Sequence, residues 1–250
     1  MKKIAVLNNK GGVGKSTITV QLAHGLAKLD FRVLLIDLDG QNDSSLFLGF
    51  SEEDYEHTFY DLIDNRYPAG LEECIIEARE NLDLLPNSNI EEINAEFHRE
   101  SRIDIILAEK LAGLENMDYD YILIDCGPSR TKINDAVLCY VDKVIMPVQL
   151  EAASVRAVGN IYEYLADLRL DPDKIALVIP NMLDIRTNEG KENLEFLEEF
   201  FEDEDILTPP VHRRVKITEA GKKGKTVFEY DKEAAQQFFK ILKKVVEKIA

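Results

Sequence analysis

The chain of 250 residues lacks any apolar run that approaches the ~18–20 residues needed to span a bilayer. Its start, Met-Lys-Lys followed by a short apolar run, is too short for a signal peptide. Hydrophobic residues make up 45% of the chain, an ordinary share for a soluble globular protein. These features predict a cytoplasmic protein, and the length predicts a single domain over residues 1–250.

Cysteine is scarce, and its spacing indicates neither a disulfide framework nor a zinc site. Cys74, Cys126 and Cys139 are odd in number, and no two of them form a C-x-x-C pair. The four histidines are scattered and form no ligand pair: His24, His57, His98 and His212. We interpret them as ordinary surface or packing residues.

Positive charge is in deficit, because the formal net charge at pH 7 is −17. That value argues against a nucleic-acid partner, but the distribution is uneven. Residues 212–250 carry 11 basic and 5 acidic side chains, and residues 213–225 carry six basic side chains and one acid. Such asymmetry indicates a local basic surface on an acidic body. A solvated C-terminal face without a ligand is the simpler alternative.

The most informative segment is residues 10–17, Lys-Gly-Gly-Val-Gly-Lys-Ser-Thr, which lies between an apolar run, Ile4–Leu7, and a helix-forming stretch, Ile18–Leu29. It is a tightened form of the phosphate-binding loop G-x-x-x-x-G-K-[ST]. Glycines let backbone N–H groups turn toward phosphate oxygens, and the following helix N-terminus adds partial positive charge. We expect Lys15 to reach the β- and γ-phosphates of ATP and the Ser16 hydroxyl to bind Mg²⁺. The predicted ATP-binding residues of the loop are Gly11, Gly12, Val13, Gly14, Lys15, Ser16 and Thr17.

Carboxylates follow two further apolar runs, where the phosphates are expected. Asp37 and Asp39 are two residues apart, so in an extended strand they share a face. Paired carboxylates there can orient an attacking water and the hydration shell of Mg²⁺. The run 119–128 has the form of a Walker B strand, in which Asp125 holds Mg²⁺ through water. The alternative is that these aspartates only cap turns.

Apolar runs alternate with helix-length segments along the whole chain. Besides residues 4–7, strands are predicted at Arg32–Asp37, Leu82–Pro86, Tyr121–Asp125, Lys143–Pro147 and Ile175–Pro180. Apolar spacing of three and four predicts helices over Glu91–Leu114, Asn134–Val141, Ala153–Leu168 and Asn188–Phe201. The alternation predicts an α/β fold of the P-loop NTPase type, with a doubly wound, mainly parallel sheet and ligands at the carboxyl ends of its strands.

Residues 10–17 resemble the deviant Walker A motif of the ParA/MinD superfamily, and the resemblance extends over roughly the whole chain. Asp-Leu-Asp-Gly-Gln at 37–41 is similar to the ParA-type Asp-Leu-Asp-Pro-Gln, with Gly40 in place of proline. Asp-Cys-Gly-Pro-Ser at 125–129 resembles Asp-Cys-Pro-Pro-Ser, and Pro-Val-Gln at 147–149 matches the same tripeptide.

Two later segments extend the resemblance. Residues 183–188 are similar to Tyr-Asp-x-Arg-Thr-Asn, and residues 211–220 to Ile-Pro-Arg-Asn-Val-Arg-Leu-Ser-Glu-Ala, where His212 replaces a proline. Since no helix-turn-helix segment precedes the loop, the chain resembles the short ParA type.

The resemblance implies an ATPase that uses ATP and Mg²⁺ and forms a homodimer around two ATP molecules. In this family the first lysine of the loop, here Lys10, crosses the dimer interface to the partner's nucleotide, like an arginine finger. Asp39 would position the hydrolytic water. Asn181, with the loop from Pro210 to Arg213, would hold the adenine base.

The resemblance also implies DNA segregation. Family members bind DNA without sequence preference through basic residues at the positions of Arg186 and Lys216. With the basic cluster, the candidate DNA-binding residues are Arg186, Arg213, Arg214, Lys216, Lys222 and Lys223. A ParB-like partner that accelerates slow hydrolysis, a nucleoid-associated ATP-bound state and a cargo such as a plasmid or chromosome are further implications.

Three alternatives stay open. The segment 238–249 is amphipathic and lysine-rich, as a membrane-binding helix of the MinD manner would be, although a final helix packed on the sheet is favoured. A metallocluster-carrying relative would need cysteines at the dimer interface, which the three unpaired cysteines do not favour. An ATP-dependent ligase or synthetase would need a second substrate pocket, which these residues do not indicate.

Overall fold

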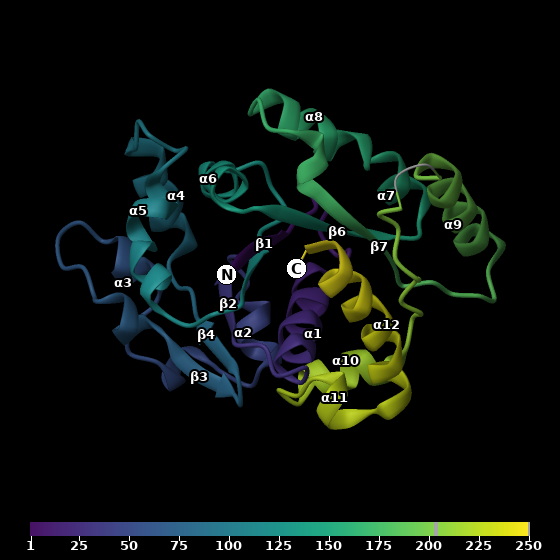
Figure 1. Cartoon of the computed structure of the whole chain (residues 1–250), viewed down its shortest axis with the longest axis horizontal. Coiled ribbons are helices and arrows are strands. Elements are labelled where there is room, and N and C mark those ends of the chain that lie inside the picture. The colour runs from purple at the N-terminus through teal and green to yellow at the C-terminus, as the bar shows by residue number, and fades with distance from the viewer. Residues whose placement is uncertain (203–204, 250) are drawn as a thin grey trace.

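The computed structural model describes residues 1–202 and 205–249, and its centre is a seven-stranded sheet (Figure 1). The strands are β1 (Lys2–Val6), β2 (Val33–Leu38), β3 (Ile76–Arg79), β4 (Leu82–Leu85), β5 (Tyr121–Cys126), β6 (Lys143–Gln149) and β7 (Ile175–Asn181). Their order across the sheet is β3-β4-β2-β5-β1-β6-β7. All neighbours pair in parallel except β3 and β4, which form an antiparallel pair at one edge. The predicted α/β fold with a mainly parallel sheet is confirmed.

Helices cover both faces of this sheet (Figure 1). In chain order they are α1 (Lys15–Ala27), α2 (Asp43–Phe47), α3 (Phe59–Ile63), α4 (Ile90–Arg99), α5 (Ile106–Lys110), α6 (Lys132–Tyr140), α7 (Ala152–Arg156), α8 (Gly159–Asp167), α9 (Asn188–Phe200), α10 (Val215–Lys222), α11 (Val227–Tyr230) and α12 (Lys232–Ile249). One hydrophobic cluster joins the sheet to α1, α11 and α12, and a second joins the other face to α3 through α9. The core therefore has two layers, one on each side of the strands.

The predicted strands occur where expected, but two predicted helices are wrong in extent. The segment Glu91–Leu114 is divided into α4, α5 and a 3₁₀ turn, Ala112–Asn116. Glu100 has an extended backbone, with φ −76° and ψ 131°, and the polar residues around it interrupt the apolar spacing. The segment Ala153–Leu168 is divided into α7 and α8, with a poor helix former, Gly159, at the junction.

The C-terminal helix α12 packs its apolar face into the core. Seven side chains of this face are buried: Ala234, Ala235, Phe238, Ile241, Leu242, Val245 and Ile249. They belong to the same cluster as α1 and the sheet. The favoured prediction of a packed final helix is confirmed, and a membrane would have to compete with the core for this face. Across residues 1–202 and 205–249, no helix is long and apolar enough to cross a membrane.

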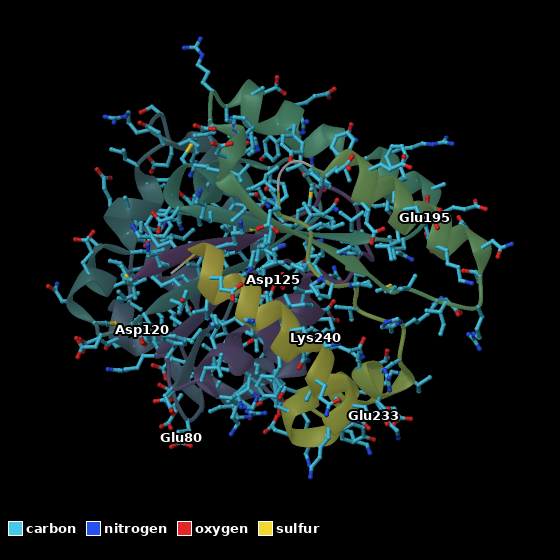
Figure 2. All side chains as sticks on the ribbon, turned by 45° about the vertical axis from the view of Figure 1, so that its right-hand side comes forward. Glu80, Asp120, Asp125, Glu195, Glu233 and Lys240 are labelled. Carbon is cyan, nitrogen blue, oxygen red and sulfur yellow. The ribbon has the colours of Figure 1, made fainter. Side chains whose placement is uncertain are left out.

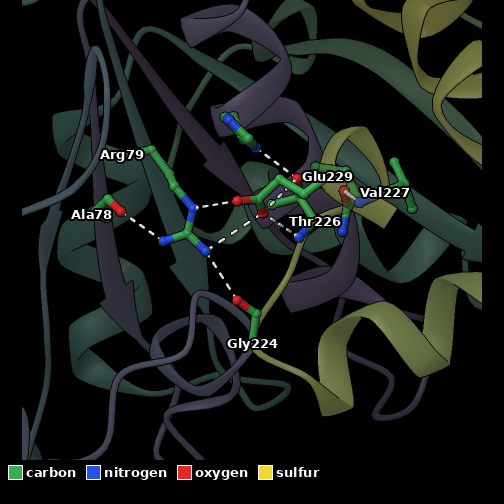
Figure 3. Close-up of polar contacts among 8 residues, drawn as sticks. Ala78, Arg79, Gly224, Thr226, Val227 and Glu229 are labelled. Carbon is green, nitrogen blue, oxygen red and sulfur yellow. Dashed lines mark hydrogen bonds and ion pairs between the residues drawn. The ribbon is translucent and has the colours of Figure 1, made fainter. Parts of the chain in front are cut away.

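A polar network ties the edge strand β3 to the segment before α11 (Figure 3). The Arg79 guanidinium donates to the carbonyl of Gly224 at 2.9 Å and to the carboxylate of Glu229 at 2.9 Å. Glu229 in turn accepts from the backbone N–H of Thr226 at 2.8 Å. One arginine thus satisfies groups on segments that are far apart in the sequence.

The same network reaches helix α1, which begins at the phosphate loop. His24 Nδ1 lies 2.6 Å from the Thr226 hydroxyl, and Gln21 accepts from the backbone N–H of Val227 at 2.9 Å. Burial lowers the pKa of His24 from 6.5 to about 4, because the charged imidazolium would lose its hydration. His24 is therefore neutral in the folded protein at pH 7.

Stability should fall as the pH is lowered from about 6.5 to about 4, because the unfolded state then binds a proton that folded His24 excludes. In His24→Gln the part of this loss that is due to the imidazole, up to about 2 kcal/mol, should disappear. Urea unfolding at pH 7 and at pH 4.5 measures the difference. The exposed His98→Gln variant is the control and should lose stability as the wild type does. Equal losses in His24→Gln and the wild type would contradict the prediction.

Candidate nucleotide-binding site

The loop between β1 and α1 has a conformation that depends on glycine. Gly12 and Gly14 have φ angles of 77° and 89°, in the left-handed region that L side chains rarely adopt. A Cβ atom on Gly14 would lie 2.4 Å from Nδ2 of Asn181, which leaves no room for a side chain. The loop can therefore curl tightly ahead of the helix N-terminus, as a phosphate cradle requires.

A cleft of about 530 Å³ opens at this loop. It is lined by the loop itself and by segments that follow β2, β5 and β7, so it lies at the carboxyl ends of the strands. Of the predicted site residues, the cleft is lined by Gly11, Gly12, Gly14, Lys15, Ser16, Thr17 and Asp39. Val13 has its side chain in the core instead. Most of the predicted loop residues therefore line one cleft, and their contacts with ATP stay a prediction.

Lys15 and Ser16 form the first turn of α1 and point a cation and a hydroxyl toward this space. Both side chains are mostly buried, with 5% and 7% of their surface exposed. The ammonium group adds to the partial positive charge of the helix N-terminus, so the start of α1 favours bound anions. A polyphosphate fits this end of the cleft.

Two carboxylates lie side by side beneath the cleft. Asp37 is the penultimate residue of β2 and Asp125 that of β5, and the two residues are direct partners in the sheet register. Both side chains are fully buried. Burial and then the charge of Asp125 raise the pKa of Asp37, and burial also raises the pKa of Asp125.

This pair fits Mg²⁺, because a hard cation with oxygen ligands offsets the repulsion of buried carboxylates. Asp125 receives a hydrogen bond from Ser44 at 2.8 Å, and Asp37 receives two from Ser45, at 2.8 Å and 2.9 Å. These serines fix the position of both carboxylates, and their contact with Mg²⁺ through water stays a prediction. Ser16 would supply the direct ligand.

Sequence reasoning missed Ser44 and Ser45, which α2 presents to the buried aspartates. Both side chains are fully buried. The available signal was the polar cluster Asn42–Ser45 directly after the second carboxylate. Short polar clusters of this kind usually indicate only a turn, so their contact with Asp37 and Asp125 depends on the fold.

Asp39 lies in the cleft, and its catalytic role stays a prediction. Its side chain is 7% exposed, and one carboxylate oxygen accepts from the backbone N–H of Gln41 at 3.1 Å. Because Asp39 is not part of the buried pair, its carboxylate is available to a water molecule in the cleft.

Lys10 points away from its own cleft. Its ammonium group donates to the Ser154 hydroxyl at 2.6 Å and lies 3.8 Å from the Glu151 carboxylate, both in the segment after β6. The side chain is 32% exposed. Lys10 is not one of the described residues that line the cleft. In this structure its side-chain partners therefore lie outside the cleft.

The three residues predicted to contact the adenine base are not among the described residues that line the cleft. Asn181, at the end of β7, donates from Nδ2 to the carbonyl of Val13 at 2.8 Å, so it supports the phosphate loop from below. Pro210 and Arg213 are not among the described residues that line the cleft. In this structure Asn181 is a support of the loop, and the adenine contact of these three residues stays a prediction.

Four of the six candidate DNA-binding residues lie on neighbouring segments beyond β7. The backbone N–H of Arg213 donates to the carbonyl of Leu183 at 2.9 Å, which holds the segment 183–187 beside 211–216. Arg186, Arg213, Arg214 and Lys216 thereby come to one edge of the sheet. Lys222 and Lys223 lie at the other end of α10, next to Gly224, whose carbonyl accepts from Arg79 of the opposite edge strand, β3. We call all six residues the basic edge, after the four that lie beside β7.

Comparison with known proteins agrees with this geometry. The AAA domain family matches residues 1–178. The sporulation initiation inhibitor protein Soj of Bacillus subtilis is 35% identical over 92% of the chain and 91% of its own length. The chromosome partitioning protein ParA of Caulobacter vibrioides is 28% identical over 99% of the chain and 95% of its own length. A crystal structure of a plasmid partition protein from Borrelia burgdorferi B31 bound to AMPPNP superposes with a TM-score of 0.82, at 26% identity and 99% coverage of both chains.

The fold and the cleft define a P-loop ATPase that uses ATP and Mg²⁺. Within that class the chain belongs to the ParA family of partition ATPases, in the ParA/MinD superfamily. The family resemblance found in the sequence is thus confirmed.

Lys15→Ala should weaken ATP binding by about 100-fold or more, because a buried, charge-assisted contact to phosphate is worth up to about 3 kcal/mol. Titration of a fluorescent ATP analogue into monomeric protein measures this. Lys10→Ala is the matched control, since it also removes one lysine of the loop but outside the cleft, and it should leave monomer affinity nearly unchanged. Similar affinities for Lys15→Ala and the wild type would refute the assignment.

Proposed function

We propose that this ATPase is a nucleotide-timed switch that segregates DNA. In the proposed cycle, residues 1–250 act as one P-loop domain, ATP joins two copies into a homodimer, and the dimer binds DNA without sequence preference. Hydrolysis, accelerated by a ParB-like partner, releases the dimer, so that a plasmid or chromosome cargo follows the bound population over the nucleoid. The single observation that carries the proposal is the joint presence of a complete phosphate cleft and a basic edge on an acidic chain.

Each step of hydrolysis has a residue in place for it. Lys15 and the N-terminus of α1 stabilise negative charge on the β- and γ-phosphates, and bound Mg²⁺ would add to this stabilisation. Ser16, Asp37 and Asp125 would hold that ion, the two aspartates through water. Asp39 would orient the attacking water toward the γ-phosphate.

Lys10 supplies the link between ATP and dimerisation. Its ammonium group lies outside its own cleft, against Ser154 and Glu151. In the proposed dimer it leaves these partners and contacts the nucleotide of the second copy. A cation that is supplied in trans stabilises charge on the transferred phosphoryl group, so hydrolysis requires the dimer.

The basic edge is proposed to contact DNA phosphates. Phosphate contacts contribute affinity that falls steeply with salt and carry no sequence information. A MinD-like attachment to membranes is the second candidate, and the buried apolar face of α12 gives it less support. The ATP-bound dimer would accordingly be nucleoid-associated.

Asp39→Ala should slow ATP hydrolysis at least about 100-fold and trap the ATP-bound dimer, because general-base positioning of water contributes roughly that factor. Steady-state phosphate release and size-exclusion chromatography with ATP measure the two effects. Hydrolysis at the wild-type rate would remove Asp39 from the mechanism.

In the Asp39→Ala background, binding to a random-sequence duplex should require ATP and weaken steeply from 50 to 200 mM salt, as expected for several phosphate contacts. Adding Lys216→Glu or Arg186→Glu should weaken it further, whereas ADP should abolish it. Fluorescence anisotropy with a labelled duplex measures all of these. An ATP-dependent dimer that binds no DNA would contradict the proposed function and favour the membrane alternative, which vesicle flotation tests.

A further inference from the structure

Half of the basic edge is already engaged by carboxylates of the same chain. Arg186 pairs with Asp184 at 2.6 Å, Arg214 with Glu233 at 2.7 Å, and Lys216 with Glu219 at 2.9 Å. Three cations are thus each paired with one carboxylate. Since these are the cations proposed to meet phosphate, each carboxylate occupies a place that a phosphate would take.

The Asp184–Arg186 pair has the geometry with which arginine recognises phosphate. Nε donates to Oδ1 at 2.8 Å and Nη2 donates to Oδ2 at 2.6 Å, so one side of the guanidinium fork is occupied. Arg186 is 84% exposed, whereas Asp184 is 23% exposed and is fixed by a further bond from the backbone N–H of Arg186. The hydrogen bonds from Arg186 hold the pKa of Asp184 well below its ordinary value. Asp184 is therefore a charged carboxylate in a fixed position that competes with a DNA phosphate for the Arg186 guanidinium.

The other two pairs hold cations on the segment 214–219. Glu233 lies near the start of α12 on the outside of the molecule (Figure 2), and it reaches Arg214 at the N-terminal end of α10. Glu219 takes up Lys216 one turn along the same helix and also accepts from the Tyr230 hydroxyl at 3.0 Å. Both carboxylates are exposed enough for a phosphate to displace them, with 75% and 39% of their side chains accessible.

The remaining three cations of the basic edge are not paired with a carboxylate among the described residues. Within residues 1–202 and 205–249, Arg213 and Lys222 form no ion pair with a carboxylate. Lys223 donates to the Tyr230 hydroxyl at 3.0 Å and lies 4.7 Å from the centre of its ring, a contact that leaves its full charge in place. The basic edge thus contains three cations that can contact a phosphate directly and three that are paired with carboxylates.

We propose that Asp184, Glu219 and Glu233 are competing acceptors that a DNA phosphate must displace, and that they set the DNA affinity of the dimer. The inference rests on the proposed function, because it assumes that the basic edge meets DNA. Its physical basis is that exposed ion pairs are weak but not worthless, so a DNA phosphate can displace the carboxylate at a small cost in affinity. A cation that must leave a carboxylate before it contacts a phosphate contributes less to DNA affinity than a cation without a carboxylate partner.

The exchange has a signature in the salt dependence. A free cation that neutralises a phosphate releases about 0.9 of a counterion, which steepens the plot of log affinity against log salt by that amount. A cation that leaves a carboxylate exposes that carboxylate's charge near the DNA, so its net release is smaller. Freeing one held cation should therefore steepen the slope, an effect that a uniform change of net charge does not produce.

The test uses the full chain with Asp39→Ala and ATP, and adds Asp184→Asn, Glu219→Gln or Glu233→Gln. These variants keep the shape of the side chain and an oxygen acceptor for the neighbouring N–H and O–H groups. Each should bind a random-sequence duplex roughly two- to fivefold more tightly, the range expected for a released exposed pair. Each should also steepen the salt slope, by up to about 0.9. Thermal melting confirms that the variants remain folded.

Glu115→Gln is the matched control, with the same change in net charge. Glu115 is exposed and lies in the 3₁₀ turn Ala112–Asn116, which precedes the amino end of β5. The segment that holds Asp184 and Arg186 follows the carboxyl end of β7, which runs in the same direction as β5, so the control lies at the opposite end of the sheet from this pair. It should leave the salt slope unchanged.

The outcomes separate this inference from the proposed function. Tighter binding and steeper slopes in the three acid variants, relative to Glu115→Gln, support the inference. If Lys216→Glu loses binding while the acid variants behave like Glu115→Gln, the proposed function stands and the inference fails. Absence of DNA binding in every protein, acid variants included, would overturn both.

Discussion

The burial of two carboxylates side by side is the constraint on which the nucleotide site depends. Asp37 and Asp125 are the penultimate residues of neighbouring strands with no exposed surface, where repulsion and lost hydration both disfavour their charges. Burial of an unpaired charge costs several kcal/mol, so such a pair persists only where the fold supplies compensation. The hydroxyls of Ser44 and Ser45 and the ammonium of Lys15 provide part of it, and a bound Mg²⁺ would add to it. Helix α2 supplies the two serines, and the phosphate loop leads into Lys15, so both segments take part in compensating the buried carboxylates.

The sequence predicted those features that depend on neighbours in the chain. The glycines of the loop, Lys15 and the strand that contains Asp125 each carry their signal within a few residues, and the structure places all of them as expected. Contacts between distant segments could not be predicted in this way. Asn181 donates to the carbonyl of Val13, 168 residues away, and nothing local to either residue indicates it. The division of the segment 91–114 was missed because the apolar spacing on both sides of Glu100 was read as one helix, although polar residues interrupt it between Phe97 and Ile103.

Charge is organised locally in this protein, despite its net value of −17. Arg79 crosses from the edge strand to Gly224 and Glu229, and so anchors the segment that carries Lys222 and Lys223 (Figure 3). Farther along, the cations of α10 and of the segment before it have acids as neighbours. A net charge therefore says little about a surface on which some of the cations are already paired with carboxylates. What matters is which pairs a polyanion can replace.

The sheet order has a consequence for synthesis on the ribosome. β1 is made before both of its partners, β5 and β6, and the loop that follows it is supported by Asn181. Until translation has passed that residue, an apolar strand and a glycine-rich loop exist without their neighbours. Parallel pairing between distant strands forms slowly, and unpaired strands are prone to aggregate in the interval. Nascent chains thus cannot gain stability from bound nucleotide until most of the sheet has been synthesised.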